Sequence, residues 1–91
     1  MKMLVNTEFL RYTNAQGAFI IALIKSIEDA NPYGCRLTKT EIANQLNFPL
    51  STVSKKTNEL IAKGVLEYES RYAKWSVLPI DTWEAPNSQA A

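Results

Sequence analysis

Apolar residues recur with helical spacing in two short stretches between positions 37 and 64, separated by one break. Thr38 and Glu41 have the spacing of a capping box, which marks the start of the first helix. The break is the tripeptide Asn-Phe-Pro at 47–49, and Gly64 ends the second helix. Two apolar stripes can pack across the break, formed by Ile42, Ala43 and Leu46 on the first helix and by Val53, Thr57, Leu60 and Ile61 on the second. The pattern predicts a helix-turn-helix.

Polar side chains occupy the face of the second predicted helix that lies opposite its apolar stripe. With about 100° between successive residues, hydroxyl, amide and ammonium groups project together from this face. Such groups can donate to phosphates and base edges, as a helix lying in a DNA major groove must do. A solvated face on an ordinary helix is the alternative interpretation. The residues predicted to contact DNA on and beside this face are Lys39, Ser51, Thr52, Ser54, Lys55, Lys56 and Asn58.

Two segments with alternating polarity, 65–69 and 74–78, predict a β-hairpin after Gly64. A turn centred on Arg71 and Tyr72 makes the alternation consistent on both faces. Neither residue is the Gly or Asn that two-residue turns favour, so a loop of about four residues is the alternative. The register opposes Leu66 to Val77, Tyr68 to Trp75 and Glu69 to Lys74. At the hairpin tip, Arg71, Tyr72 and Lys74 are predicted to contact DNA beside the helix.

The segment LTKTEIANQLNFPLSTVSKKTNELIAKGVLEYE resembles the winged helix-turn-helix of bacterial and phage DNA-binding proteins. The resemblance covers roughly residues 35–78, with Leu60, Gly64 and Leu66 at the positions that end the recognition helix and begin the wing. It implies an α+β, mostly helical fold with a long N-terminal helix, a helix-turn-helix and a C-terminal β-hairpin wing. It also implies a brief strand at 35–37 beside the hairpin.

The segment departs from the family pattern at two positions. Pro49 stands where the family often has a capping Ser at the start of the recognition helix. Thr57 stands where a Leu is common in the contact between the two helices. The first departure bears on where the second helix starts, and the second weakens the expected contact between the two helices at Thr57.

A longer helix is predicted before this module, from the capping-box spacing at 13–16 to about Ala30. Its apolar arc is broad for a small monomer, so we expect part of it to contact a second subunit in a homodimer. Ile20, Ile21 and Ile24 are the predicted contact residues. Coverage by an N-terminal arm, residues 1–11, is the alternative.

One domain is predicted over residues 1–83, followed by a flexible tail at 84–91. We expect Trp83 to dock back on the body because of its size. The predicted core residues are Phe19, Leu23, Ile42, Leu46, Val53, Leu60, Leu66 and Val77.

Charge and chemistry narrow the range of functions. The chain has a formal net charge of +1, but residues 36–74 hold seven basic against four acidic groups. Cys35 is the only cysteine and histidine is absent, so neither an intramolecular disulfide nor a zinc site is expected. The longest apolar run, 18–24, is too short to cross a bilayer, and no signal peptide is visible, so a cytoplasmic protein without membrane or cofactor is expected.

The sequence does not suggest an enzyme, because it lacks a phosphate-binding glycine loop, a metal-ligand cluster and carboxylates paired for acid–base chemistry. Three binding functions remain. The first is a dimeric, sequence-specific regulator of transcription that binds double-stranded DNA. The second is a phage or plasmid replication protein that binds an origin or single-stranded DNA, since the stretch YAKWSVLPIDTW and the element order are similar to those of replication initiators. The third is a protein-interaction module without nucleic acid, favoured by the low net charge and by Glu67 and Glu69 in the wing.

Overall fold

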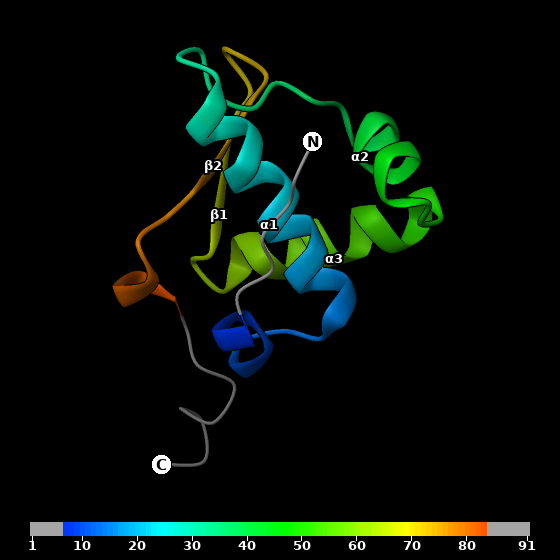
Figure 1. Ribbon diagram of the computed structural model, residues 1–91, viewed down its shortest axis with the longest axis vertical. Coiled ribbons are helices and arrows are strands. Elements are labelled where there is room, and N and C mark those ends of the chain that lie inside the picture. The colour runs from blue at the N-terminus through cyan, green and yellow to red at the C-terminus, as the bar shows by residue number, and fades with distance from the viewer. Residues whose placement is uncertain (1–6, 84–91) are drawn as a thin grey trace.

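The helices and the hairpin follow one another in the order that the sequence predicts. The computed structural model describes residues 7–83, which form a small, mostly helical α+β fold (Figure 1). This order is compatible with a winged helix-turn-helix layout. The predicted tail at 84–91 and residues 1–6 of the predicted arm lie outside the described residues. The elements are η1 (Thr7–Arg11), α1 (Ala15–Ala30), α2 (Lys39–Leu46), α3 (Leu50–Ala62), β1 (Leu66–Glu69), β2 (Lys74–Val77) and η2 (Ile80–Thr82).

Helix α1 runs through the middle of the molecule, and the other elements pack around it (Figure 1). It contacts η1, α2, α3 and β2. Ile20, Ile21 and Ile24 are each 0% exposed within the single chain. The prediction that these three isoleucines form a dimer contact is therefore wrong, because they have no surface to offer a second subunit. A helical wheel gives the width of an apolar arc but not the number of elements that cover it.

The first turn of α1 is capped by Asn14 rather than by Thr13. The Asn14 Oδ1 accepts a hydrogen bond from the backbone N–H of Gly17 at 3.0 Å, so the helix begins one residue later than the capping-box spacing predicts. The helix ends at Ala30, as predicted, and Gly34 in the following loop has a φ of 80°.

The helix-turn-helix forms with the predicted boundaries. Thr38 and Glu41 make the capping box of α2, each side chain accepting from the other residue's backbone N–H. Asn47 ends α2 in the left-handed conformation, with a φ of 58°. The N–H of Phe48 donates to the Ala43 carbonyl at 2.9 Å, as in a Schellman motif. Local hydrogen bonding therefore fixes the turn between the two helices.

Gly64 ends α3 through the same motif. Its φ is 74°, and the N–H of Val65 donates to the Leu60 carbonyl at 2.9 Å. A Cβ built on Gly64 would lie 2.7 Å from the Thr82 carbonyl oxygen, so a larger residue would also meet the C-terminal segment. The chain thereby turns directly from the helix into the hairpin.

The hairpin has the predicted register, with Leu66 opposite Val77 and Tyr68 opposite Trp75. The two strands form an antiparallel sheet whose connection spans the four residues 70–73. The predicted strand at 35–37 is reduced to one bridge, between Cys35 and Trp75, whose backbone N–H donates to the Cys35 carbonyl at 2.7 Å.

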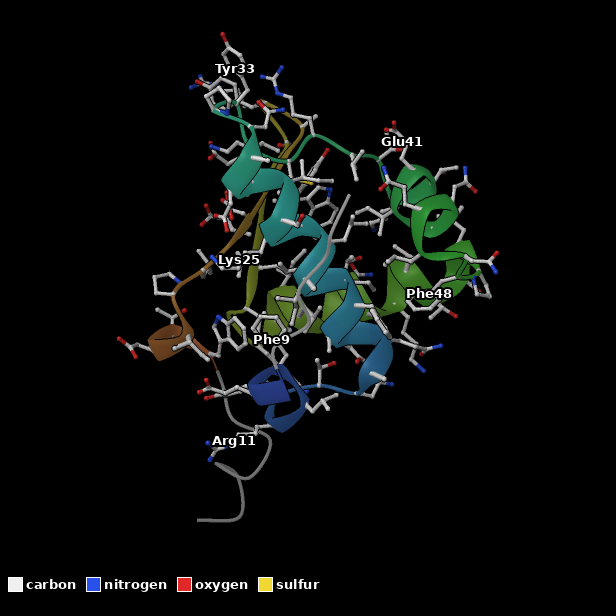
Figure 2. The ribbon with its side chains drawn as sticks, in the orientation of Figure 1. Phe9, Arg11, Lys25, Tyr33, Glu41 and Phe48 are labelled. Carbon is white, nitrogen blue, oxygen red and sulfur yellow. The ribbon has the colours of Figure 1, made fainter. Side chains whose placement is uncertain are left out.

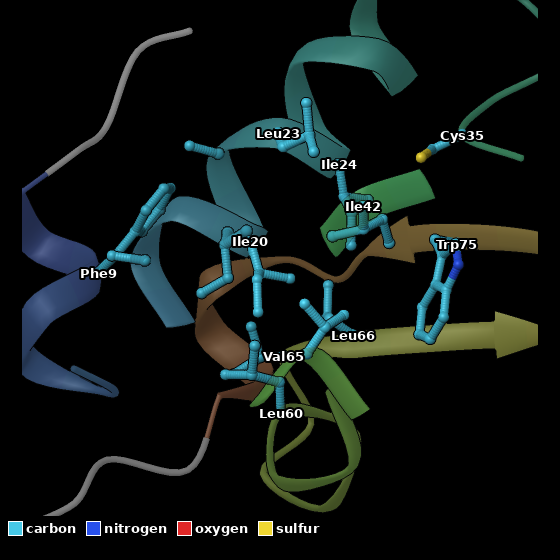
Figure 3. Close-up of a cluster of buried hydrophobic side chains, with 14 of the residues drawn as sticks. Phe9, Ile20, Leu23, Ile24, Cys35, Ile42, Leu60, Val65, Leu66 and Trp75 are labelled. Atoms are coloured by element: carbon cyan, nitrogen blue, oxygen red, sulfur yellow. The ribbon is translucent and has the colours of Figure 1, made fainter. Parts of the chain in front are cut away.

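One hydrophobic core lies between α1, α3 and the hairpin, as Figure 3 shows for Ile20, Leu60 and Leu66. Of the predicted core residues, Leu23, Ile42, Val53, Leu60 and Leu66 are buried, and Leu46 and Val77 are partly buried. Phe19 is 39% exposed, so its assignment to the core is wrong.

Phe19 lies at the edge of the core, where its ring contacts that of Phe48 at a centroid distance of 6.3 Å. Figure 2 places Phe48 in the turn between α2 and α3. The predicted docking of Trp83 is confirmed, since its ring lies 5.5 Å from Phe9 and 5.0 Å from Tyr12. Within residues 7–83, no helix combines the length and apolar character that spanning a membrane requires.

Candidate nucleic-acid interface

Helix α3 has two opposite faces with the same residue spacing. Val53, Thr57 and Leu60 are each 0% exposed and face the core. The other face presents Ser51, Lys55 and Asn58, which are all exposed and lie four and then three residues apart. We call these three residues the polar stripe of α3. Packing of the inner face fixes the direction in which the polar stripe points.

Thr57 fits the core in place of the leucine common at this position. Its Oγ1 lies 2.9 Å from the Val53 carbonyl oxygen and 3.0 Å from that of Ser54, so the hydroxyl is satisfied within the helix. The buried polar group therefore needs no partner from another element. This departure from the family pattern leaves the orientation of α3 intact.

Acidic groups near the polar stripe are engaged elsewhere. Glu59 accepts from the Lys56 Nζ at 3.2 Å, and the Lys56 side chain is only 17% exposed. Lys56, predicted to contact DNA, is therefore largely occupied by an ion pair. The Glu41 carboxylate is held in the capping box of α2. No ion pair or hydrogen bond within residues 7–83 engages Lys55, so its ammonium is available for an anion.

Lys39, at the start of α2, joins this surface from a second element. Its Nζ lies 3.5 Å from the Ser54 Oγ, which brings a further ammonium group to the side of α3. Ser54 and Thr52 are half-buried on the flanks of the polar stripe. The structure therefore brings Lys39 of α2 beside Ser54 and the polar stripe of α3.

The first turn of α3 has free backbone donors. Pro49 precedes the helix and provides no side-chain cap, and the first turn contains no acidic residue. The backbone N–H groups of this turn lie at the positive end of the helix dipole, where phosphate oxygens bind favourably. Because Pro49 stands where a capping Ser is common, the N-terminus of α3 is open to an anion.

The hairpin tip forms a separate part of the surface. Arg71 and Tyr72 are exposed in the four-residue loop, and Ala73 there has a φ of 50°. Lys74 is half-buried, and its aliphatic stem packs on Gly34, where an added Cβ would lie 2.6 Å from the Lys74 Cε. Arg71 is therefore the most accessible predicted cation of the wing.

Comparison with known proteins adds no assignment to this surface. Neither the models of protein families, nor the curated proteins, nor the solved structures include a match for this chain. The function therefore has to be argued from the side chains that the fold brings together.

A groove between α2, α3 and the hairpin is the feature that sequence reasoning did not foresee. It has a volume of about 430 Å³ and is lined by Leu37, Thr38, Lys39, Asn58, Ile61, Tyr68 and Trp75. Ile61, expected on the inner stripe of α3, is 41% exposed here, so that expectation is wrong. Tyr68 is 42% exposed although its strand partner Trp75 is buried. The alternating pattern predicts that Tyr68 and Trp75 are paired across the hairpin. It does not predict which of the two rings other elements will cover.

The only cysteine is not part of this surface chemistry. Cys35 is fully buried, and burial raises the pKa of its thiol, with a further rise from the carboxylates of Glu28 and Glu41 and an opposing effect of a backbone hydrogen bond with Leu37. A buried neutral thiol is a poor nucleophile. Among the described residues, no group of three or more His, Cys, Asp or Glu side chains could hold a metal ion.

Proposed function

We propose that this protein binds double-stranded DNA as a winged helix-turn-helix and acts as a sequence-specific regulator of transcription. Helix α3 lies in the major groove with its polar stripe toward the base edges, and Arg71 contacts the backbone or minor groove alongside. The observation that carries this proposal is the exposed row of Ser51, Lys55 and Asn58 directly opposite the buried inner face of α3.

The charges of this surface support binding that is weak and salt-dependent for one copy. Lys39 and Arg71 can each neutralise a phosphate, whereas Lys55 is directed at the base edges. Each such contact contributes about −0.9 to the slope of log affinity against log salt, so one copy should give a slope of about −1.8. A slope near zero would contradict phosphate contact by these residues.

The sharpest test adds one negative charge to the polar stripe. Ser51 is the second residue of α3, so Ser51→Glu places a carboxylate at the positive end of the helix dipole. This change should stabilise the helix by about 0.3–1 kcal/mol and yet weaken DNA binding by repelling phosphates. Thermal unfolding and fluorescence anisotropy with labelled duplex DNA would measure the two effects separately.

The matched control is Gln16→Glu. Gln16 is the second residue of α1, whose first turn also lacks an acidic residue, so the same charge is added at the same helical position. This variant should keep wild-type affinity for DNA. Equal affinities of the wild type and Ser51→Glu would contradict the docking of α3.

Single-stranded and double-stranded DNA should be compared in the same assay at low salt. Tighter binding of duplex supports the regulator. A preference for single strands would favour the replication function. Binding to neither would favour a protein-interaction module, for which the exposed Glu67 and Glu69 of β1 provide an acidic surface.

A further inference from the structure

The groove beside α3 contains an aromatic ring that the fold holds in place but does not cover. The Tyr68 ring lies 4.5 Å from that of Trp75, centroid to centroid, at an interplanar angle of 50°. Trp75 is itself fixed, because its Nε1 donates to the Leu37 carbonyl at 2.9 Å. The buried indole therefore supports one side of Tyr68, which is 42% exposed as a residue and lines the groove.

The lining of the groove combines apolar surface with a few donors. Ile61, 41% exposed, supplies an aliphatic wall, and Asn58 and Lys39 supply an amide and an ammonium group. None of the lining residues carries a carboxylate. The volume of about 430 Å³ is within the range of roughly 300–1,000 Å³ typical of sites for small ligands. This composition fits a planar, polar-edged group attached to an anion.

The groove is continuous with the proposed DNA-binding surface. Asn58 belongs both to the polar stripe and to the groove, and Lys39 lines the groove while its Nζ lies 3.5 Å from Ser54 on α3. DNA bound along α3 would therefore pass beside Tyr68. Enzymes and other proteins that accept a base outside the helical stack hold it between aromatic and apolar side chains and bind its edge with polar groups.

We propose that this groove receives one unpaired nucleobase of the bound DNA. The base stacks on the open side of Tyr68 against Ile61, the Asn58 amide binds its edge, and Lys39 lies near the adjoining phosphate. This inference rests on the proposed DNA-binding function and adds a preference for DNA that contains an unpaired nucleotide. Because Trp75 already holds the tyrosine ring, stacking would not require a mobile side chain to be ordered.

The test uses three DNAs that differ at one position: a paired duplex, the same duplex with one unpaired nucleotide, and that DNA with an abasic residue as the unpaired nucleotide. The last two have the same backbone, so their comparison isolates the base. The wild-type protein should bind the unpaired base more tightly than the abasic residue by roughly 5- to 150-fold, the range expected for loss of one stacked base. Equal affinities would overturn the inference without any need for a variant.

Three tyrosine variants assign the preference to the groove. Tyr68→Ala should bring the ratio of the two affinities to about one, whereas Tyr68→Phe should preserve it because the ring remains. Tyr33→Ala is the control, since Tyr33 is 72% exposed in the loop after α1 (Figure 2) but does not line the groove. A full preference in Tyr68→Ala, or its loss in Tyr33→Ala, would overturn the inference.

The same measurements separate the two proposals. If the protein binds the paired duplex but does not distinguish the unpaired base from the abasic residue, the proposed function stands and the base-binding role of the groove is refuted. If the protein binds none of the three DNAs at low salt, both proposals are refuted.

Discussion

Lys55 and Arg71 should make different contributions to binding of one duplex. Lys55 lies in the middle of the polar stripe, between Ser51 and Asn58, and can reach a base edge in the major groove. Arg71 lies at the hairpin tip and can reach only the sugar-phosphate backbone or a minor groove. Lys55→Ala should therefore reduce sequence discrimination, and Arg71→Ala should reduce affinity for all sequences alike.

The magnitudes follow from the number of cations that can reach a phosphate. With two phosphate contacts, affinity should fall about 12-fold over a fourfold rise in salt, and with the one left in Arg71→Ala it should fall about 3.5-fold. Losing a base contact in Lys55→Ala should cost on the order of 1–3 kcal/mol of discrimination at one base pair. Anisotropy titrations at several salt concentrations, with the preferred duplex and single-base variants of it, would measure both quantities.

The double variant Lys56→Ala with Glu59→Ala is the control on the same helix. These side chains neutralise each other across 3.2 Å, so removing both should leave the salt slope unchanged. The pair is partly exposed, with side chains 17% and 39% accessible, so its loss should cost only about 0.2–1 kcal/mol of stability. If both Lys55→Ala and Arg71→Ala bind as the wild type does at low salt, the docking of helix and wing is refuted.

Three further predictions concern the fold that holds the site. Ile21→Ala should lower the free energy of unfolding in urea by about 2–5 kcal/mol without changing the oligomeric state in sedimentation, because Ile21 is buried within one chain; a shift in sedimentation would contradict this. Trp83→Ala should cost about 3–5 kcal/mol by removing the contacts with Phe9 and Tyr12, and an unchanged thermal midpoint would show that this docking does not stabilise the fold. Burial raises the pKa of Cys35, so the stability that the neutral thiol contributes is fully present below its ordinary pKa and is lost as the pH rises through the folded pKa. The free energy of unfolding in urea should therefore fall at alkaline pH, and it should fall less in Cys35→Ala. Equal falls in the two proteins would contradict this.

The local signals in the sequence determined the elements and their order. The capping box at Thr38, the left-handed Asn47 and the helix-ending Gly64 each act through hydrogen bonds within a few residues, so each could be located without knowledge of the fold. The register that pairs Tyr68 with Trp75 also followed from alternation, because a slip of one residue would reverse both faces of the hairpin.

Only the tertiary structure decided which of these side chains are covered. Ile21 is buried because four other elements pack around α1. The periodic pattern of one helix does not predict how many other elements will cover it. Ile61 and Tyr68 remain exposed because they line a groove between α2, α3 and the hairpin, although each residue belongs to an apolar pattern. Periodicity reports the direction of a side chain on its own element, whereas burial depends on the position of distant parts of the chain, and so the polar stripe could be predicted but the groove could not.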